Sequence, residues 1–222
     1  PDAQATARVI TRQLGVFCGA LWVNETLRQI DQTIQIQWEV KDGDRVAPDQ
    51  VLFVLKGRAR SLLSAERTLL NFVQLLSGTA TRTAHYVALL SDTDTQLLDT
   101  RKTTPGLREF EKLAVCLGGG TNHRMGLYDM ILVKDNHVDY AGSMAQALAN
   151  VADYLDRLKA NLPVVVEVRD PVETRAAMEA RAHFQKPNGK PLVDRLLLDN
   201  HTPEEVAEMV AQWGREIPLE AS

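Results

Sequence analysis

Strand-like and helix-like segments alternate regularly through the second half of this chain. Short apolar runs predict five strands, over residues 96–100, 130–134, 164–168, 196–199 and 217–222. Longer segments with helical periodicity predict helices between them, over residues 108–117, 143–161 and 171–184 and from Thr202 onward. Such alternation is typical of βαβ units, whose strands pair in a parallel sheet. The pattern therefore predicts an α/β protein.

The first half of the chain differs, because a strand-rich stretch precedes one long helix. Strands are predicted over residues 7–10, 15–19, 33–40 and 51–55. From Arg60 to Leu90 the apolar residues recur at helical spacing. A polar stripe lies opposite them, formed by Arg60, Ser64, Arg67, Asn71 and Gln74. Arg67 is a candidate site residue, because amides and hydroxyls rather than acids surround it on this face.

Polar residues lie at the carboxyl end of each predicted strand in the second half. In chain order they are Asp99 to Lys102, Lys134 to His137, Glu167, Asp199 to His201, and Ser222. In α/β barrels this edge of the sheet builds the active site. The glycines Gly118–Gly120 precede a basic segment, Thr121–Arg124, and could let that segment fold into the same site. The sequence therefore predicts a barrel enzyme with its site at the strand ends.

The charges at these strand ends are mostly positive, although the whole chain carries a net charge of −4. We expect one mouth to hold Arg101, Lys102, His123, Arg124 and Lys134, with Glu167 and Asp199 as its acids. Arg binds carboxylate or phosphate through two parallel hydrogen bonds, and Lys acts as a point charge. The pattern indicates a small, highly anionic ligand. Two carboxylates among so many cations suit Mg²⁺ or sugar hydroxyls better than an acid–base pair.

Composition excludes several other classes of protein. A net charge of −4 argues against a general nucleic-acid or membrane-surface binder. No apolar run approaches the ~18 residues that a membrane-spanning helix needs. Cys18 and Cys116 are too few for a disulfide framework or a cysteine zinc site, and we therefore expect a reducing compartment, most simply the cytoplasm.

Several stretches of the chain together resemble one known family. They are Glu66–Phe72, Leu76–Thr81, Leu98–Arg108, Gly118–Arg124, Lys134–His137, Val166–Val168 and Leu198–Asn200. In this order they resemble the motifs of the quinolinate phosphoribosyltransferases. The resemblance implies an amino-terminal α/β sandwich domain over residues 1–70 and an incomplete α/β barrel, the catalytic domain, over residues 71–222. It also implies a homodimer, possibly assembled into a hexamer, in which each sandwich covers the partner's barrel mouth.

The resemblance further implies a role for each candidate residue. Contacts to quinolinate and phosphate fall on Arg67, Thr100, Arg101, Lys102, His123, Arg124 and Lys134, with Arg67 donated to the partner's site. Glu167 and Asp199 resemble the residues near the ribose hydroxyls and Mg²⁺. Lys102 and Lys134, with these two acids, are the expected catalytic residues. Ser222 matches the serine that opens a glycine-rich phosphate loop, and the family continues beyond it, so we expect this chain to be a trimmed one.

The implied reaction joins quinolinate to phosphoribosyl pyrophosphate and yields nicotinate mononucleotide, pyrophosphate and CO₂, a step of NAD biosynthesis. Mg²⁺ would accompany phosphoribosyl pyrophosphate, and no organic cofactor is needed.

Three other interpretations remain open at this stage. A Schiff-base lyase or aldolase could use Lys102 or Lys134 as its nucleophile. A nicotinate phosphoribosyltransferase would share the fold and one substrate but needs fewer cations. A non-catalytic anion-binding homologue, like the family's molybdenum-transport relative, is disfavoured by the intact basic residues.

Overall fold

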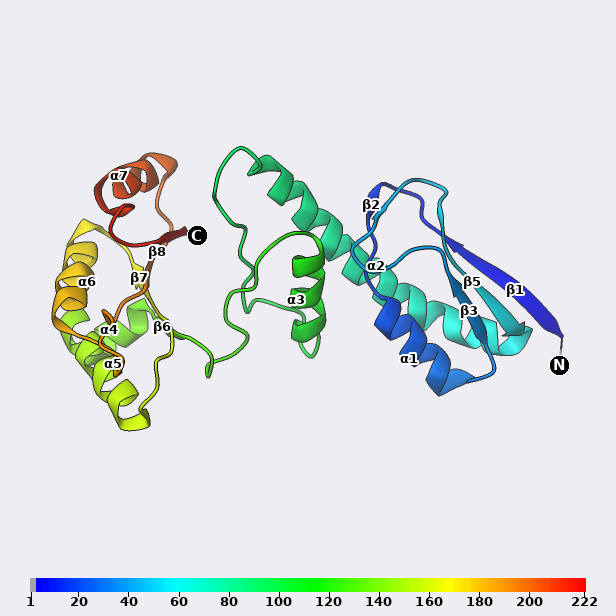
Figure 1. Ribbon diagram of the computed structural model, residues 1–222, viewed down its shortest axis with the longest axis horizontal. Helices are drawn as coiled ribbons and strands as arrows, with labels where there is room; N and C mark the ends of the chain where they lie inside the picture. Colours follow the sequence, from blue (N-terminus) through cyan, green and yellow to red (C-terminus); the bar gives the residue numbers. More distant parts are fainter. Residues whose placement is uncertain (1–2) are drawn as a thin grey trace. The chain divides into compact units, whose positions relative to one another are not determined.

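The computed structural model describes residues 3–222, which form two compact units. The amino-terminal unit ends at Met125 and the carboxyl-terminal unit begins at Gly126 (Figure 1). Within residues 3–222, no helix is long and apolar enough to cross a membrane.

An antiparallel sheet with helices on it opens the amino-terminal unit. The sheet has the order β1–β5–β3, formed by β1 (Gln4–Ile10), β5 (Val51–Arg58) and β3 (Gln35–Trp38). A two-stranded pair joins β2 (Gly15–Val16) to β4 (Arg45–Val46), and the first two helices are α1 (Ala20–Ile30) and α2 (Ala59–Leu89). One core holds Val23 and Leu27 of α1, Leu69 of α2 and Phe53 of β5. This arrangement confirms the predicted α/β sandwich.

The long helix α2 buries one face along its whole length. Its buried residues recur at steps of three or four and are Leu62, Ala65, Leu69, Val73, Leu76, Ala80 and Thr83. The last of these pack near α3 (Arg108–Leu117), where Ala114 shares a core with Leu76 and Ala80. Because α2 runs across residue 70, the boundary between residues 1–70 and 71–222 lies within a continuous helix, and the domain division stays a prediction.

A parallel four-stranded sheet forms the carboxyl-terminal unit. Its strands lie in chain order as β6 (Ile131–Val133), β7 (Val164–Val168), β8 (Arg195–Leu198) and β9 (Leu219–Ala221). The helices between them are α4 (Asp135–Ala141), α5 (Met144–Leu158), α6 (Pro171–His183) and α7 (Pro203–Trp213). One core joins Val166 and Leu196 to Leu148 of α5, Ala177 of α6 and Met209 of α7, so helices cover one face of the sheet. Parallel strands with crossover helices on one face agree with the predicted incomplete barrel.

Three local predictions were wrong. Residues 20–30 form a helix in a stretch that the sequence analysis interpreted as strand-rich. The distant Asp42 caps the start of this helix, because its Oδ1 accepts hydrogen bonds from Gly19 N at 2.7 Å and Ala20 N at 3.1 Å. Residues 96–100 form no regular strand, because Leu98 makes only a single bridge to Thr121. The helix α4, which begins directly after Lys134, was not predicted.

Two free cysteines lie in the amino-terminal unit. Cys18 is buried, and this burial raises the pKa of its thiol to about 12, so the reactive thiolate is scarce at neutral pH. Cys116 lies exposed on α3.

The contact between α2 and the end of α3 makes Gly118 sensitive to substitution. A Cβ at Gly118 would lie 2.4 Å from the carbonyl oxygen of Ala80 and 2.6 Å from Cβ of Thr83. We expect Gly118→Ala to lower the free energy of unfolding by about 2 kcal/mol, because overpacking of this kind typically costs 1–3 kcal/mol. Urea denaturation measures the change.

Gly78 provides the matched control, since it also lies on α2 and a Cβ there meets nothing within 4 Å. Gly78→Ala should leave stability unchanged or raise it, because Ala favours the helix. Equal stability of the two variants would contradict the packing argument.

Candidate active site

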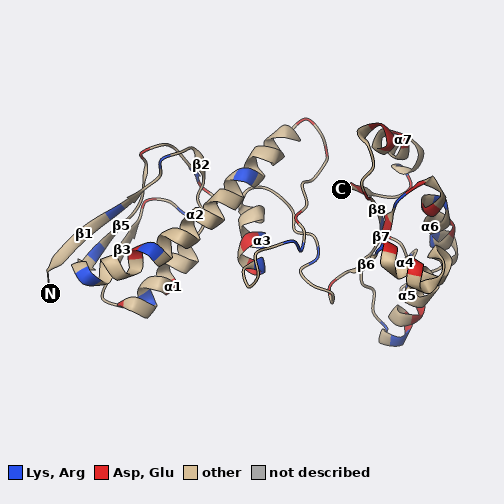
Figure 2. Ribbon diagram, turned by 180° about the vertical axis from the view of Figure 1, so that it is seen from behind, with Lys and Arg blue, Asp and Glu red and all other residues tan. Residues whose placement is uncertain are grey.

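Two segments of the amino-terminal unit that carry predicted cations lie side by side. Thr121 N donates to Leu97 O at 2.8 Å, and Asp99 N donates to Thr121 O at 3.1 Å. These bonds place residues 100–102 beside residues 121–124. Figure 2 shows basic positions in blue in the loops beside α3. The structure thus brings together two of the basic stretches that the sequence indicated.

A buried ion pair joins these segments to α3. Lys112 is 1% exposed, and its Nζ donates to Oδ1 of Asp99 and, at 3.0 Å, to the carbonyl of His123. The same carboxylate oxygen accepts from His123 N at 2.8 Å. With its amide nitrogen turned toward acceptors, Asn122 donates to Oδ2 of Asp99 at 2.6 Å. Backbone and side-chain groups therefore fix the 121–123 stretch.

Arg101 carries the clearest sign of an anionic ligand. Its Nε is buried and has no hydrogen-bond partner within residues 3–222. An unpaired buried N–H is costly, and a carboxylate or phosphate oxygen would satisfy it. Thr100 and Lys102 beside it are exposed, and Thr100 Oγ1 accepts from Lys102 N at 2.9 Å.

Arg108 at the start of α3 braces the same loop. Its guanidinium donates to the carbonyls of Arg101 at 3.4 Å and Met125 at 3.3 Å, and to Thr103 Oγ1 at 3.3 Å. It binds protein oxygens and so supports the loop that carries Arg101.

Arg67 lies on the exposed face of α2, away from the buried stripe of this helix. It makes no ion pair with any residue in the described range 3–222. Its charge is therefore available to a ligand or a second chain.

The carboxyl-terminal unit pairs two of the candidates directly. Lys134 follows β6, and its Nζ lies 3.0 Å from Oε2 of Glu167 on β7. Glu167 is 6% exposed, whereas the Lys134 side chain is 47% exposed. Glu167 therefore already has a basic partner within the protein. In this ion pair the carboxylate of Glu167 is buried and the Lys134 side chain is partly exposed to solvent.

Strand alternation places all four candidates of this unit on one face of the sheet. Val166 points into the helix-covered core, so its neighbour Glu167 points to the opposite face. By the same alternation Lys134, Asp199 and Ser222 share that face with Glu167. The strand ends are held together, since Ser222 N donates to Leu198 O at 3.1 Å. Asn200 Nδ2 donates to Oδ2 of Asp199 at 2.8 Å.

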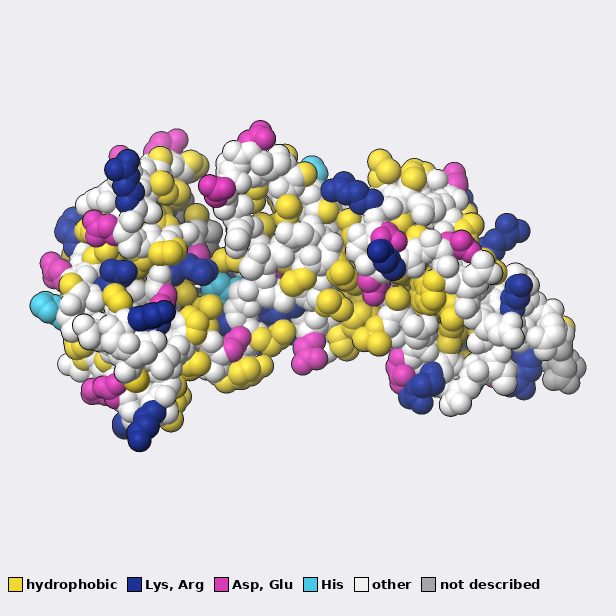
Figure 3. All heavy atoms as spheres, in the orientation of Figure 1, with side chains coloured by type: hydrophobic (Ala, Val, Ile, Leu, Met, Phe, Trp, Pro, Cys, Tyr) yellow, Lys and Arg dark blue, Asp and Glu magenta, His cyan; other side chains and the backbone are white. Residues whose placement is uncertain are grey.

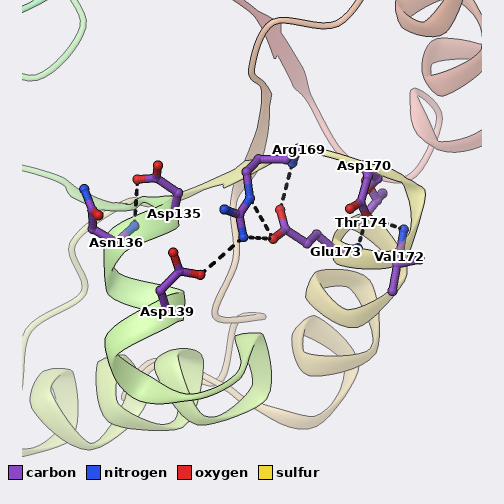
Figure 4. A network of polar contacts seen from close by, with 8 residues as sticks. All are labelled: Asp135, Asn136, Asp139, Arg169, Asp170, Val172, Glu173 and Thr174. Carbon is purple, nitrogen blue, oxygen red and sulfur yellow. Dashed lines mark hydrogen bonds and ion pairs between the residues drawn. The ribbon is translucent and has the colours of Figure 1, made fainter.

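One strongly paired cation near this edge does not join the candidate set. Arg169, just after β7, donates from Nε to Glu173 Oε1 at 2.9 Å and lies 3.4 Å from Asp139 (Figure 4). The hydrogen bonds that Arg169 donates to Glu173 raise the pKa of its guanidinium above the usual range. Two carboxylates already balance this charge, so Arg169 links α4 to α6 instead of offering a cation to a ligand.

The acids of the described chain form no protein-built metal cage. Within residues 3–222, no group of three or more His, Cys, Asp or Glu side chains is placed to hold a metal ion. Glu167 and Asp199 could each offer one carboxylate to a cation that takes its other ligands from water and phosphate. Mg²⁺ is commonly bound in that way.

Sequence reasoning missed Asp99, Lys112 and Arg108 as supports of the candidate site. Lys112 is buried on α3, but it lies two residues from Ala114 and so on a different side of the helix, and no apolar periodicity within α3 marks it. The roles given to the ten candidate residues themselves stay predictions.

A sandwich followed by parallel βαβ units, with basic residues at loops and strand ends, defines a two-domain α/β protein suited to small anions. Comparison with known proteins is more specific. The family model described as the quinolinate phosphoribosyl transferase N-terminal domain matches residues 1–77, and the model of its C-terminal domain matches residues 79–222. This chain belongs to the quinolinate phosphoribosyltransferase family.

Individual relatives agree with the family models. A probable nicotinate-nucleotide pyrophosphorylase of Bacillus subtilis is 38% identical over 221 residues, covering 100% of this chain and 72% of the relative. A mitochondrial quinolinate phosphoribosyltransferase of Nicotiana tabacum is 36% identical over 90% of this chain, which spans only 55% of that relative. The structure of the Francisella tularensis nicotinate-nucleotide pyrophosphorylase matches with a TM-score of 0.89 and 41% identity, covering 100% of this chain and 74% of that one.

Proposed function

We propose that this protein transfers the phosphoribosyl group of phosphoribosyl pyrophosphate to quinolinate, with loss of CO₂, to give nicotinate mononucleotide for NAD biosynthesis. Membership of the family across both domain models carries the proposal. The buried Nε of Arg101 supports it, because this group lacks an acceptor that an anionic substrate would supply.

The basic residues would bind and orient the two anionic substrates. We assign contacts with quinolinate and phosphate to Arg67, Thr100, Arg101, Lys102, His123, Arg124 and Lys134, and a phosphate contact to Ser222. Holding both reactants in one geometry lowers the barrier by converting a two-body encounter into a reaction within a complex. Positive charge near the departing pyrophosphate disperses the negative charge that develops there.

The acids Glu167 and Asp199 would bind the ribose hydroxyls and stabilise the positive charge that grows on the ribosyl carbon. The same carboxylates would hold Mg²⁺ through water or through the substrate, because each offers a single carboxylate. When bound, this ion neutralises charge on the pyrophosphate. The pyridine nitrogen attacks with its own lone pair, so the protein needs no general base for bond formation.

Decarboxylation follows from the substrate's own chemistry. Once its nitrogen is alkylated, the pyridinium ring stabilises the carbanion left when the adjacent carboxylate departs as CO₂. The protein's part is then to hold the remaining carboxylate and the ring, and no organic cofactor is needed.

A homodimer that receives Arg67 from the neighbouring chain belongs to the same proposal, and a hexamer of such dimers is compatible with it. The outward face of α2 carries Arg67 together with Leu63 and Leu89, which are 72% and 68% exposed. Hydrophobic side chains also lie exposed over the amino-terminal unit in Figure 3. Leu63 lies one helical turn from Arg67, and an exposed leucine beside an unpaired cation is suited to a partner surface. With two free cysteines, we place the protein in the cytoplasm.

The Schiff-base alternative is disfavoured by the ion pair of Lys134. A nucleophilic lysine needs its Nζ free to attack, whereas the Nζ of Lys134 lies 3.0 Å from Oε2 of Glu167.

The experiment that tests the function follows CO₂ from quinolinate labelled at the carboxylate next to the ring nitrogen. Full-length protein should release label only when phosphoribosyl pyrophosphate and Mg²⁺ are both present. Release without phosphoribosyl pyrophosphate, or no release at all, would contradict the proposed reaction.

Substrate choice gives a further prediction. Quinolinate should bind at least about 30-fold more tightly than nicotinate, because a missing carboxylate leaves a buried cation unpaired, which typically costs ~2–5 kcal/mol. Titration calorimetry with both acids measures the ratio. Equal affinities would favour a nicotinate phosphoribosyltransferase instead.

A further inference from the structure

The buried pair Lys112–Asp99 contacts the loop that carries two of the proposed substrate residues. We propose that Lys112 is a positioning residue, which holds the loop 121–124 so that His123 and Arg124 face the anionic substrate. The inference rests on the proposed function and deepens it, because neither Lys112 nor Asp99 is itself given a substrate contact.

The hydrogen bonds show how the pair controls the loop. Lys112 Nζ donates to the carbonyl oxygen of His123 at 3.0 Å, and Asp99 Oδ1 accepts from the N–H of His123 at 2.8 Å. Both backbone groups of His123 are therefore fixed by one ion pair. Lys112 is 1% exposed and the Asp99 side chain 7%, so water competes little for these bonds. Arg124 is the next residue, so fixing the backbone of His123 also restricts the position of Arg124.

The charges give the pair a second effect on substrate binding. Asp99 lies two residues before Arg101 and three before Lys102 in sequence. An unpaired carboxylate there would repel an anionic substrate and attract the basic side chains meant for it. Lys112 balances this carboxylate from the buried side and leaves the basic side chains available to the substrate.

A second buried lysine offers a matched control. Lys186 is 6% exposed and donates from Nζ to Asp194, which in turn accepts from Val164 N at 2.7 Å. It belongs to the carboxyl-terminal unit and bonds none of the proposed substrate residues. Lys112→Met and Lys186→Met each remove a buried lysine that is paired with an aspartate, although the Asp194 side chain is 40% exposed, and only the first variant releases a binding loop.

The test measures kcat and KM for both substrates, together with amide hydrogen exchange of the peptide that covers residues 121–124. We expect Lys112→Met to lower kcat/KM for quinolinate about 100-fold, the loss expected when binding groups are misplaced by about 1 Å. Most of the loss should lie in KM, and exchange in the loop peptide should rise. Lys186→Met should change kcat/KM for quinolinate less than about threefold.

A double variant covers the case in which Lys112→Met does not fold. Asp99→Leu with Lys112→Met replaces the buried pair by apolar residues, a change that is often neutral for stability. This protein should fold, yet keep the raised quinolinate KM and the fast loop exchange, because both hydrogen bonds from the pair to the backbone of His123 are then lost.

Two results would overturn the inference. One is a folded Lys112 variant with wild-type quinolinate KM, and the other is equal losses in the Lys112 and Lys186 variants. Failure of the proposed function is a separate outcome, since it would appear as wild-type protein that releases no CO₂. Loop exchange would still report whether Lys112 fixes residues 121–124.

Discussion

Variants Arg67→Ala and Lys102→Ala are each expected to lose nearly all activity, and a mixture of the two to regain about a quarter of the wild-type value. If Arg67 serves the neighbouring chain's site, each mixed dimer contains one site in which both residues are intact. Random exchange makes about half of the dimers mixed, each with one working site of two. The measurement is the CO₂-release rate after subunits are mixed and allowed to exchange.

The control for this experiment is an Arg101→Ala and Lys102→Ala mixture. These residues lie in one stretch of one chain, so reassortment creates no intact site and activity should stay absent. Mass spectrometry of differently tagged chains confirms that exchange took place. No recovery in the Arg67 mixture, despite exchange, would show that Arg67 acts within its own chain.

Substitutions of Lys134 should separate an electrostatic role from a nucleophilic one. We expect Lys134→Ala to lower kcat/KM at least about 1,000-fold, since it removes a substrate contact and leaves the buried Glu167 carboxylate unpaired, a loss on the order of 4 kcal/mol. Lys134→Arg keeps the charge and should retain about tenfold more activity than Lys134→Ala. Steady-state kinetics with quinolinate as the varied substrate measures both.

Stability must be measured alongside, because Glu167 is 6% exposed and tolerates loss of its partner poorly. The double variant Lys134→Met with Glu167→Gln should recover thermal stability without recovering activity. Equal abolition of activity in folded Lys134→Arg and Lys134→Ala would instead favour a lysine nucleophile.

Local signals predicted most of the carboxyl-terminal unit. The capping box at Thr202 and Glu205 predicted the start of α7, and the structure shows Thr202 N donating to Glu205 Oε2 at 2.8 Å. The all-buried strand β7 appeared in the sequence as a continuous apolar run around Glu167. The sequence was sufficient to predict a helix or strand where residues close in sequence supply its apolar pattern and its capping groups.

Long-range partners explain what the sequence could not show. The start of α1 depends on Asp42, which lies 22 residues after Ala20, the first residue of the helix. The predicted strand at 96–100 is replaced by a single bridge to Thr121, a partner beyond α3. Likewise the role of Lys112 depends on its hydrogen bonds to Asp99 and His123. Helical periodicity does not identify these two partners. Residue type therefore suggested the candidate cations, and tertiary contacts added their supports.

The boundary between the two family models falls inside the helix α2, where the chain has no structural break. The 31 residues of this helix span about 46 Å at 1.5 Å per residue, and the two family models meet near its middle, between residues 77 and 79. A chain divided at that junction would have α2 broken into two pieces. The division would also split one hydrophobic core, because Leu76 lies on one side of the junction and Ala80 on the other. It would therefore expose Leu76 on one fragment and Ala80 and Ala114 on the other. The core around Phe53 and Leu69 would stay within the first fragment. The family models and the hydrophobic cores therefore have different boundaries in this chain. Gene fragments that end at the junction of the family models should yield insoluble products.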